Sequence, residues 1–198
     1  MKKCYNDISG AILAGGRNSR MGSPKYFLKV KGKRIIDSAL DVLSGLFPEI
    51  LIITDDRTRF SDIKRAKIVE DAIKGLGPVG GIYTGLGHAS HETVFFVAGD
   101  MPFLHIELIR REIGIFKAEN CDALVPKIRD SIEPLHAIYK KGLKDNMRHF
   151  IAKNSRCSVK DFLKTVNVCY WDLEDNSFHR NAFRNLNTQD DLKEIQGL

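Results

Sequence analysis

The chain has 198 residues, of which 43% are hydrophobic and 28% are charged, and its formal net charge at pH 7 is +6. This length suits one large domain that buries roughly 70% of its unfolded surface, whereas two independent domains would each be small. No segment approaches the ~20 consecutive apolar residues of a membrane helix, and Asn6 and Asp7 interrupt the start of the chain too early for a secretion signal. We therefore expect a single domain over residues 1–198 that is neither membrane-bound nor secreted.

Short apolar runs alternate along the chain with stretches of helical periodicity. The runs predict strands at 8–13, 50–54, 66–69, 93–100, 122–126, 135–139 and 168–172. The periodic stretches predict helices near 35–47, 78–89, 106–116, 141–152 and 158–164, and a last helix from Thr188. This alternation indicates an α/β protein with one three-layer α/β/α domain, built on a mostly parallel, Rossmann-like sheet with right-handed crossovers.

The positive charge is concentrated in the first part of the chain. Residues 1–34 contain nine Lys or Arg and one acid, Asp7, so this segment carries +8 and the remainder −2. It offers only Tyr5, Tyr26 and Phe27 as aromatics, too few for a nucleic-acid surface, and the charge fits a small polyphosphate better. The four cysteines lie far apart without a Cys-x-x-Cys pair, which is typical of reduced thiols in a cytoplasmic protein.

The first predicted strand runs directly into the basic, glycine-rich loop "LAGGRNSRMGSPK" at residues 13–25. Ligands of parallel α/β sheets bind beyond the carboxyl ends of the strands, where this loop lies. Gly15 and Gly16 allow a ligand to approach the backbone, since neither has a Cβ. Arg17, Arg20 and Lys25 supply cations suited to phosphate oxygens. The loop does not match the Walker A pattern.

A second motif, "FFVAGDMPF", places Asp100 at the end of another predicted strand. A carboxylate there suits Mg²⁺, which binds through one or two protein oxygens together with substrate phosphates. The alternative is that Asp100 caps the helix that begins near His105. A Gly-x-Gly-x-x-Gly pattern at residues 75–80 lies too far from its strand for a dinucleotide fingerprint. His88 and His91 have helical spacing for a metal but lack a third ligand nearby.

Several motifs together carry a resemblance to a known family. They are "LAGGRNSRMGSPK", "ILIITDD", "VED", "GPVGG", "VAGDMPF" and "FRNLNTQDDL". Over residues 8–195 the chain resembles the molybdenum cofactor guanylyltransferases of the nucleotidyltransferase superfamily. The resemblance implies transfer of GMP from GTP to molybdenum-molybdopterin with release of pyrophosphate, and Mg²⁺ as cofactor. It also implies a molybdenum insertion protein and molybdoenzyme chaperones as partners.

The resemblance also implies roles for individual residues. Lys25, Asp100 and Arg20 would be catalytic, and Asp100 would bind the metal. The GTP site would comprise Leu13, Ala14, Gly15, Gly16, Arg17, Lys25, Thr54, Asp71, Gly77, Pro78, Gly80 and Asp100. Asn185, Asn187 and His136 would lie on the acceptor side, although a structural role in the core is an alternative for His136. The family often has Asn at the position of Thr54.

The residue types fit this chemistry independently of the resemblance to the family. A phosphate monoester is already a nucleophile at neutral pH, so the main task is to offset the repulsion between two anions, which Lys25, the two arginines and a metal on Asp100 would do. Two other classes stay open. One is another nucleotidyltransferase, either a cytidylyl enzyme for the same pterin or a sugar-phosphate enzyme. The other is a non-catalytic adaptor that delivers the cofactor, which would not need both Lys25 and Asp100.

Overall fold

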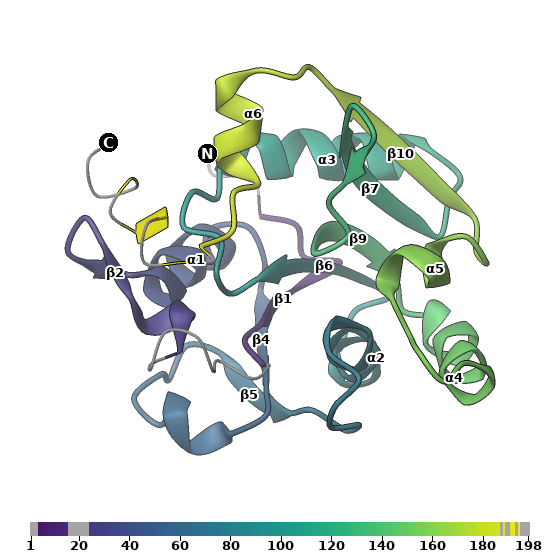
Figure 1. Ribbon diagram of the computed structural model, residues 1–198, viewed down its shortest axis with the longest axis horizontal. Helices are drawn as coiled ribbons and strands as arrows, with labels where there is room; N and C mark the ends of the chain where they lie inside the picture. Colours follow the sequence, from purple (N-terminus) through teal and green to yellow (C-terminus); the bar gives the residue numbers. More distant parts are fainter. Residues whose placement is uncertain (1–3, 16–23, 187, 189–190, 193, 195–198) are drawn as a thin grey trace.

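The computed structural model describes residues 4–15, 24–186, 188, 191–192 and 194, and its centre is a mixed sheet (Figure 1). The strands run in the order β10-β7-β9-β6-β1-β4-β5, and β8 pairs with β7. Their bounds are β1 (Ile8–Leu13), β4 (Glu49–Thr54), β5 (Lys67–Glu70), β6 (Thr93–Ala98), β7 (Ala123–Ile128), β8 (Ser131–Ile132), β9 (His136–Lys140) and β10 (Val168–Leu173). The neighbouring pairs are parallel except where β9 lies antiparallel between β6 and β7 and where β8 pairs with β7. The predicted fold class, mostly parallel α/β, is confirmed.

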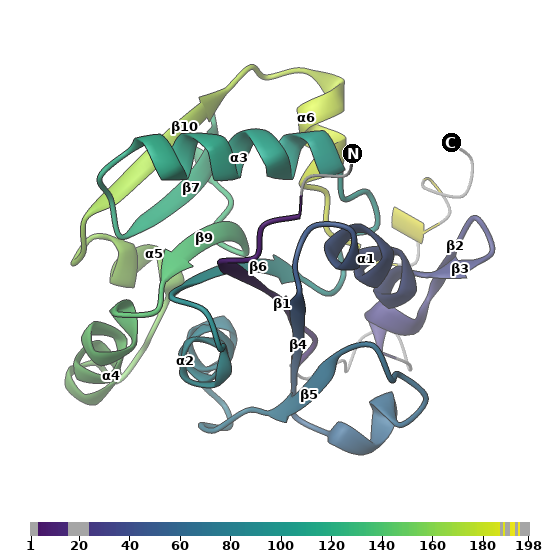
Figure 2. The same ribbon diagram turned by 180° about the vertical axis from the view of Figure 1, so that it is seen from behind.

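Helices cover both faces of this sheet. Their bounds are α1 (Ile35–Ser44), α2 (Pro78–His88), α3 (Ile106–Ala118), α4 (Leu143–Lys153), α5 (Val159–Leu163) and α6 (Ser177–Ala182). One face packs against α1 and α3, and the opposite face packs against α2, α4 and α5. Figure 2, seen from behind, shows α1 and α3 on one side of the strands and α2 and α4 on the other. The three predicted layers are therefore present.

The strand sequences explain why both faces are covered. In β1, Ala11 belongs to the core under α2, while its neighbour Ile12 belongs to the core under α1 and α3. Successive side chains of a strand point to opposite faces, so a strand that is apolar at every position needs an apolar partner layer on each side. Helix α2 comes especially close to the sheet, because Gly85 presents no Cβ to the ring of Phe96.

Some elements differ from the prediction. The segment after the glycine-rich loop forms a single 3₁₀ turn, η1 (Lys25–Phe27), and a small hairpin of β2 (Lys29–Val30) and β3 (Lys33–Arg34). A second 3₁₀ turn, η2 (Arg57–Phe60), follows β4, and α6 was not predicted. Part of the helix predicted from Thr188 lies outside the described residues. Within the described ranges, no helix is both long and apolar enough to cross a membrane.

Candidate nucleotide-binding site

A cavity of about 990 Å³ opens at the carboxyl ends of β1, β4 and β6. Its lining comprises Leu13, Gly15, Lys25, Tyr26, Ile53, Thr54, Asp55, Asp71, Lys74, Gly75, Gly77, Pro78, Gly81, Ala98, Asp100 and Leu135. Eight residues named from the sequence are in this list, and they come from five separate segments of the chain. The structure thus brings the glycine-rich loop, the end of β4, the start of α2 and Asp100 to one place.

Two predicted nucleotide-binding residues are not in the lining. Ala14 is 1% exposed, and its amide donates a hydrogen bond to the Ile53 carbonyl at 2.8 Å. Gly80 faces inward, since a Cβ there would lie 3.0 Å from the Ile73 carbonyl oxygen, and Gly81 borders the cavity instead. Four other predicted residues fall outside the described part of the chain; they are Gly16, Arg17, Arg20 and Asn187.

Asp100 lies in the turn after β6, between the first strand and the C-terminal segment. The amide of Gly99 donates to the Leu13 carbonyl at 2.9 Å, and the amide of Leu186 donates to the Asp100 carbonyl at 2.9 Å. The carboxylate is 26% exposed, and its Oδ2 lies 3.8 Å from Nζ of Lys25. Burial raises the pKa of Asp100 above its ordinary value, and the nearby ammonium of Lys25 opposes this rise.

This environment fits a divalent cation. The Asp100 carboxylate is mostly removed from water, which disfavours its charge, and a bound cation would offset that cost. No group of three or more His, Cys, Asp or Glu side chains able to hold a metal occurs within the described ranges. The protein would therefore supply Asp100 and leave the other positions to phosphate oxygens and water, as magnesium sites commonly do.

Asp71, another carboxylate of the lining, is held by a residue of α2 and by the segment that precedes this helix. Its Oδ1 accepts hydrogen bonds from the Thr84 hydroxyl at 2.8 Å and from the Ile73 amide at 3.3 Å. Its own amide donates to the Thr54 carbonyl at 2.8 Å, which fixes the end of β5 against the end of β4. Thr54 is fully buried and its hydroxyl interacts with the backbone of Asp56. The side chain of Thr54 thus organises the turn after β4.

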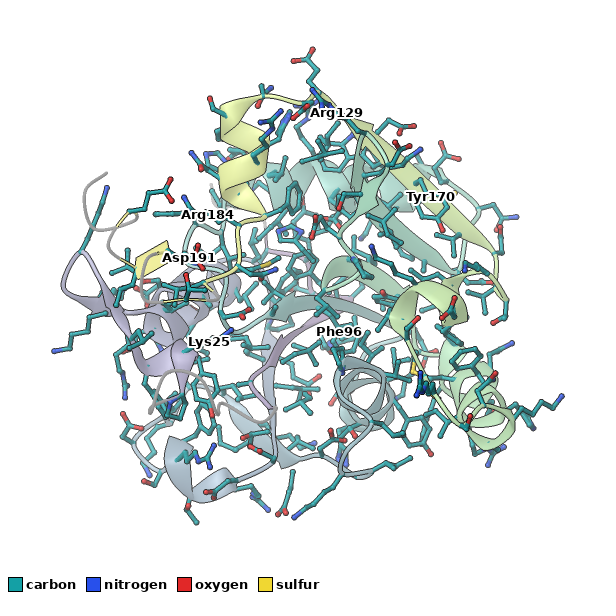
Figure 3. All side chains as sticks on the ribbon, in the orientation of Figure 1. Lys25, Phe96, Arg129, Tyr170, Arg184 and Asp191 are labelled. Carbon is teal, nitrogen blue, oxygen red and sulfur yellow. The ribbon has the colours of Figure 1, made fainter. Side chains whose placement is uncertain are left out.

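The acceptor-side residues have different surroundings. His136 is fully buried, with Nδ1 3.2 Å from Oε2 of Glu112 and its ring edge-on to Phe95 and Phe183. It has no exposed surface that a ligand could contact, which favours the structural role in the core over contact with the acceptor. Asn185 is partly buried, and its Oδ1 has no hydrogen-bond partner among the described residues. Figure 3 labels its neighbour Arg184, which forms an ion pair with Asp191 at 3.6 Å.

Several cavity residues were not predicted from the sequence. Tyr26 and Asp55 directly follow predicted residues, so their position in the chain was a usable signal. Lys74 lies near Asp71 and pairs with Glu70 at 2.8 Å. Leu135 comes from the connection between β8 and β9, and its carbonyl accepts the Ala98 amide at 2.8 Å. Its place depends on the antiparallel pairing of β9, which no local pattern revealed.

Comparison with known proteins agrees with this arrangement. A model of the MobA-like NTP transferase domain matches residues 10–167, a range that contains the glycine-rich loop, Asp71 and Asp100. The chain belongs to this family. Its relatives are named as guanylyltransferases, and the protein is an enzyme of the nucleotidyltransferase type.

The similarity to individual proteins covers most of the chain. A probable molybdenum cofactor guanylyltransferase of Peptoclostridium acidaminophilum is 36% identical over 94% of this chain and 87% of its own length. A protein of the same description from Natranaerobius thermophilus is 35% identical over 96% of both chains. The crystal structure of molybdopterin-guanine dinucleotide biosynthesis protein A from Archaeoglobus fulgidus superposes with a TM-score of 0.81 at 29% identity, covering 96% of this chain and 97% of its own.

Proposed function

We propose that the protein transfers GMP from GTP to molybdenum-molybdopterin, forming the guanine dinucleotide form of the molybdenum cofactor. The observation that carries the proposal is the pairing of Lys25 with Asp100 in a cavity at the carboxyl ends of the strands, in a chain whose relatives are named for this reaction. The reaction belongs to cofactor synthesis, for which we propose a cytoplasmic location. Molybdenum insertion proteins and molybdoenzyme chaperones would be its partners.

The reaction exchanges one bond at phosphorus. An oxygen of the acceptor's terminal phosphate forms a bond to the α-phosphorus of GTP. The bond from that phosphorus to the oxygen bridging to the β-phosphate breaks, and pyrophosphate leaves with the electron pair. The attacking oxygen carries no proton that must be removed at neutral pH, so the protein's tasks are to align two anions and to stabilise the charge that moves to the leaving group.

Lys25 and Asp100 divide these tasks. The Lys25 ammonium is 21% exposed and lies at the cavity wall, where it would contact phosphate oxygens as a point charge. Asp100 would hold Mg²⁺, which when bound offsets the negative charge of the phosphates. Arg17 and Arg20 would add positive charge from the glycine-rich loop.

The nucleoside would lie between the end of β1 and the start of α2. The cavity lining there comprises Leu13, Gly15, Asp71, Gly77 and Pro78. Gly77 has φ +60°, a conformation that favours glycine, and Pro78 begins the helix. We assign Asp71 to the guanosine, since its fixed Oδ1 leaves the rest of the carboxylate to accept hydrogen bonds from a ligand.

The acceptor would bind on the side of Asp100 away from the nucleoside. The Leu186 amide ties this segment to the Asp100 carbonyl, so Asn185 lies next to the Asp100 turn, where the reacting phosphates would bind. The unpartnered Oδ1 of Asn185 supports a polar contact there. Asn187 continues the same segment, and we assign both asparagines to the acceptor side.

The direct test is transfer by the purified protein with each of the four NTPs, Mg²⁺ and molybdenum-molybdopterin, measured as pyrophosphate release and as formation of the dinucleotide. We expect GTP to be the preferred donor. Preference for CTP would contradict the guanylyl assignment and favour the cytidylyl alternative. Absence of transfer with every NTP, while the protein still binds the pterin, would favour the adaptor.

Gly15 offers a sharper test of base choice. A Cβ at Gly15 would lie 3.7 Å from its nearest protein neighbour, the Asp55 amide nitrogen, so alanine fits without a clash inside the protein. On the ligand side, the added methyl group would crowd the bicyclic guanine more than cytosine. We expect Gly15→Ala to lower the ratio of GTP use to CTP use by roughly 5- to 150-fold in kcat/KM, as expected for loss of one or two buried hydrogen bonds. An unchanged ratio in a competition assay would show that Gly15 shapes the loop without selecting the base.

A further inference from the structure

Lys25 is carried by a short structural element with little stability of its own. The η1 turn is closed by two hydrogen bonds, from the Phe27 amide to the Pro24 carbonyl and from the Leu28 amide to the Lys25 carbonyl, both 3.0 Å. A single 3₁₀ turn is weak in isolation, because few backbone hydrogen bonds compensate for the ordering of its residues. Contacts with other parts of the fold must therefore fix the position of the Lys25 backbone.

The residues after Lys25 provide such contacts. The ring of Tyr26 stacks on Phe60 with centroids 5.2 Å apart and planes at 30°, and Phe27 meets the same Phe60 ring at 5.2 Å. Tyr26 is 4% exposed and Phe60 is fully buried. Phe60 belongs to η2, the turn that follows β4. Two short turns from different parts of the chain thus hold each other through three aromatic rings.

The hydroxyl end of Tyr26 is also held. Arg59 donates a hydrogen bond from its guanidinium to the Tyr26 hydroxyl at 3.4 Å. The same guanidinium pairs with Asp56 at 3.2 Å and lies 3.7 Å from Asp55. Tyr26 and Asp55 both line the cavity, one beside Lys25 and the other at the end of β4. Arg59 therefore connects the turn that carries Lys25 to the residues that follow β4.

We propose that Tyr26 and Phe60 are positioning residues for the transfer reaction, whose ring stack fixes the η1 turn so that the Lys25 ammonium reaches the phosphates. The inference rests on the proposed function. Lysine has a long, flexible side chain, and its charge is useful in catalysis only when its backbone origin is fixed. With the stack in place, Nζ of Lys25 lies 3.8 Å from Oδ2 of Asp100, and both residues line the cavity. Loss of the stack would let the whole turn shift while leaving the lysine itself intact.

A double-mutant cycle between Tyr26 and Lys25 tests this relation. We expect Tyr26→Leu, which removes the stacking ring, to lower kcat about 10-fold, while Tyr26→Phe keeps the ring and retains kcat within about 3-fold, since misplacement of a catalytic group is costly. In a Lys25→Ala background, Tyr26→Leu should change kcat by less than about 2-fold, because residues that act through one contact are not additive. Equal effects of Tyr26→Leu in both backgrounds would overturn the proposal.

A matched control separates positioning from general stability. Phe162 is fully buried and packs against Phe150 at 5.6 Å, between α4 and α5 and outside the cavity lining. Phe162→Leu should lower the thermal midpoint at least as much as Tyr26→Leu and leave kcat unchanged at a temperature where both variants are folded. A similar loss of kcat in Phe162→Leu would contradict positioning.

Two further outcomes are distinguishable. If Tyr26→Leu does not fold, Phe60→Leu breaks the same stack from the other side, and its effect must again vanish in the Lys25→Ala background. A wild-type protein that transfers no nucleotide would contradict the proposed function, whereas an active wild type with additive variants would contradict only the role of Tyr26 and Phe60.

Discussion

A carboxylate lies at each end of the central strands, and the two carboxylates have different surroundings. At the amino end, Glu49 begins β4, and its carboxylate accepts hydrogen bonds from the Ser9 hydroxyl at 2.6 Å, the Ser90 amide at 2.8 Å and the Ser90 hydroxyl at 2.7 Å. At the carboxyl end, Asp100 follows β6 and has the Lys25 ammonium at 3.8 Å. The strand β1 pairs with both β4 and β6, so the two sites lie at opposite ends of the same part of the sheet.

The pKa values of these two groups shift in opposite directions. Burial disfavours the charge of Glu49, but the hydrogen bonds from Ser9 and Ser90 outweigh it and hold the pKa of Glu49 below its ordinary value. Burial also disfavours the charge of Asp100, and here the pKa rises because Lys25 offsets only part of the cost. The charge of Glu49 is therefore stabilised by protein groups alone. The charge of Asp100 is only partly compensated by the protein, so a cationic ligand would stabilise it further.

We expect the largest effect from substitution of Asp100, whose charge the protein compensates only in part. Asp100→Asn keeps the shape of the side chain and removes its charge, and we expect turnover to fall by at least ~10²-fold, a loss of about 2.7 kcal/mol in transition-state stabilisation. The thermal midpoint should stay unchanged or rise, because a poorly compensated buried charge has been removed. Steady-state kinetics and thermal unfolding on the same preparation provide the check. Near-normal turnover in the folded variant would exclude a metal-binding role for Asp100.

The next largest effect is expected in β1, where Gly10 packs against the ring of Phe47. A Cβ at Gly10 would lie 2.8 Å from Cδ2 of Phe47, whose ring is 3% exposed and stacks on Phe95. We expect Gly10→Ala to lower the free energy of unfolding by about 2 kcal/mol, a typical cost of overpacking a core, while leaving base preference unchanged. Gly15→Ala is the matched control from the loop that follows the same strand, where the nearest protein atom would be 3.7 Å away. Equal stability of the two variants in urea unfolding would contradict this contrast.

A smaller effect is expected from substitution of Glu49, whose carboxylate accepts three hydrogen bonds within the protein. Glu49→Gln should lower the free energy of unfolding by about 1 kcal/mol at pH 7, because an amide replaces the charged acceptor of three hydrogen bonds. Activity should not change, since Glu49 lies outside the cavity lining. Denaturant unfolding of both proteins measures the difference, and a variant as stable as the wild type would show that the hydrogen bonds to Glu49 contribute little.

The stability difference between the wild type and Glu49→Gln should depend on pH, and the direction of the pKa shift of Glu49 determines how. The folded-state pKa of Glu49 is lowered from its ordinary value of 4.5, so the unfolded chain takes up a proton first as the pH falls. The stabilisation by Glu49 is therefore full above the unfolded pKa and is lost as the pH falls through the folded pKa. The wild type and Glu49→Gln should converge in stability in acid. A stability gap that stays constant from pH 7 to about pH 3 would contradict this assignment.

Most of the fold could be predicted because its signals are local. The run "TVFFVA" is apolar at nearly every position and forms β6, and Pro78 after Gly77 marks the start of α2. Helix α6 was missed because "SFHRNA" is short and has no apolar stripe, although Asn176 caps it by accepting the His179 amide at 2.9 Å. The antiparallel position of β9 could not be derived, since a strand's sequence does not reveal the direction of its neighbours.

The candidate site was predictable where function requires particular residue types in a continuous motif. Lys25 and Asp100 were named from separate motifs, and the structure places them 3.8 Å apart. Contacts that depend on long-range packing gave no such signal. Glu112 is fully buried beside His136, yet in the sequence it reads as an ordinary charged residue of a surface helix. The stack of Tyr26 on Phe60 likewise joins two turns that only the folded chain brings together.

The hydrogen bond from the Leu186 amide to the Asp100 carbonyl has a consequence for how the protein is made. A ribosome finishes the glycine-rich loop, β6 and Asp100 long before it reaches Leu186. Until then the Asp100 turn lacks the segment that holds its carbonyl and brings Asn185 beside it. A truncation before residue 183 would keep all the described strands, the last of which ends at Leu173, and should nevertheless lack a complete reaction centre. The reaction centre is thus completed by a late segment of the chain, although five of the six motifs lie within the first 103 residues.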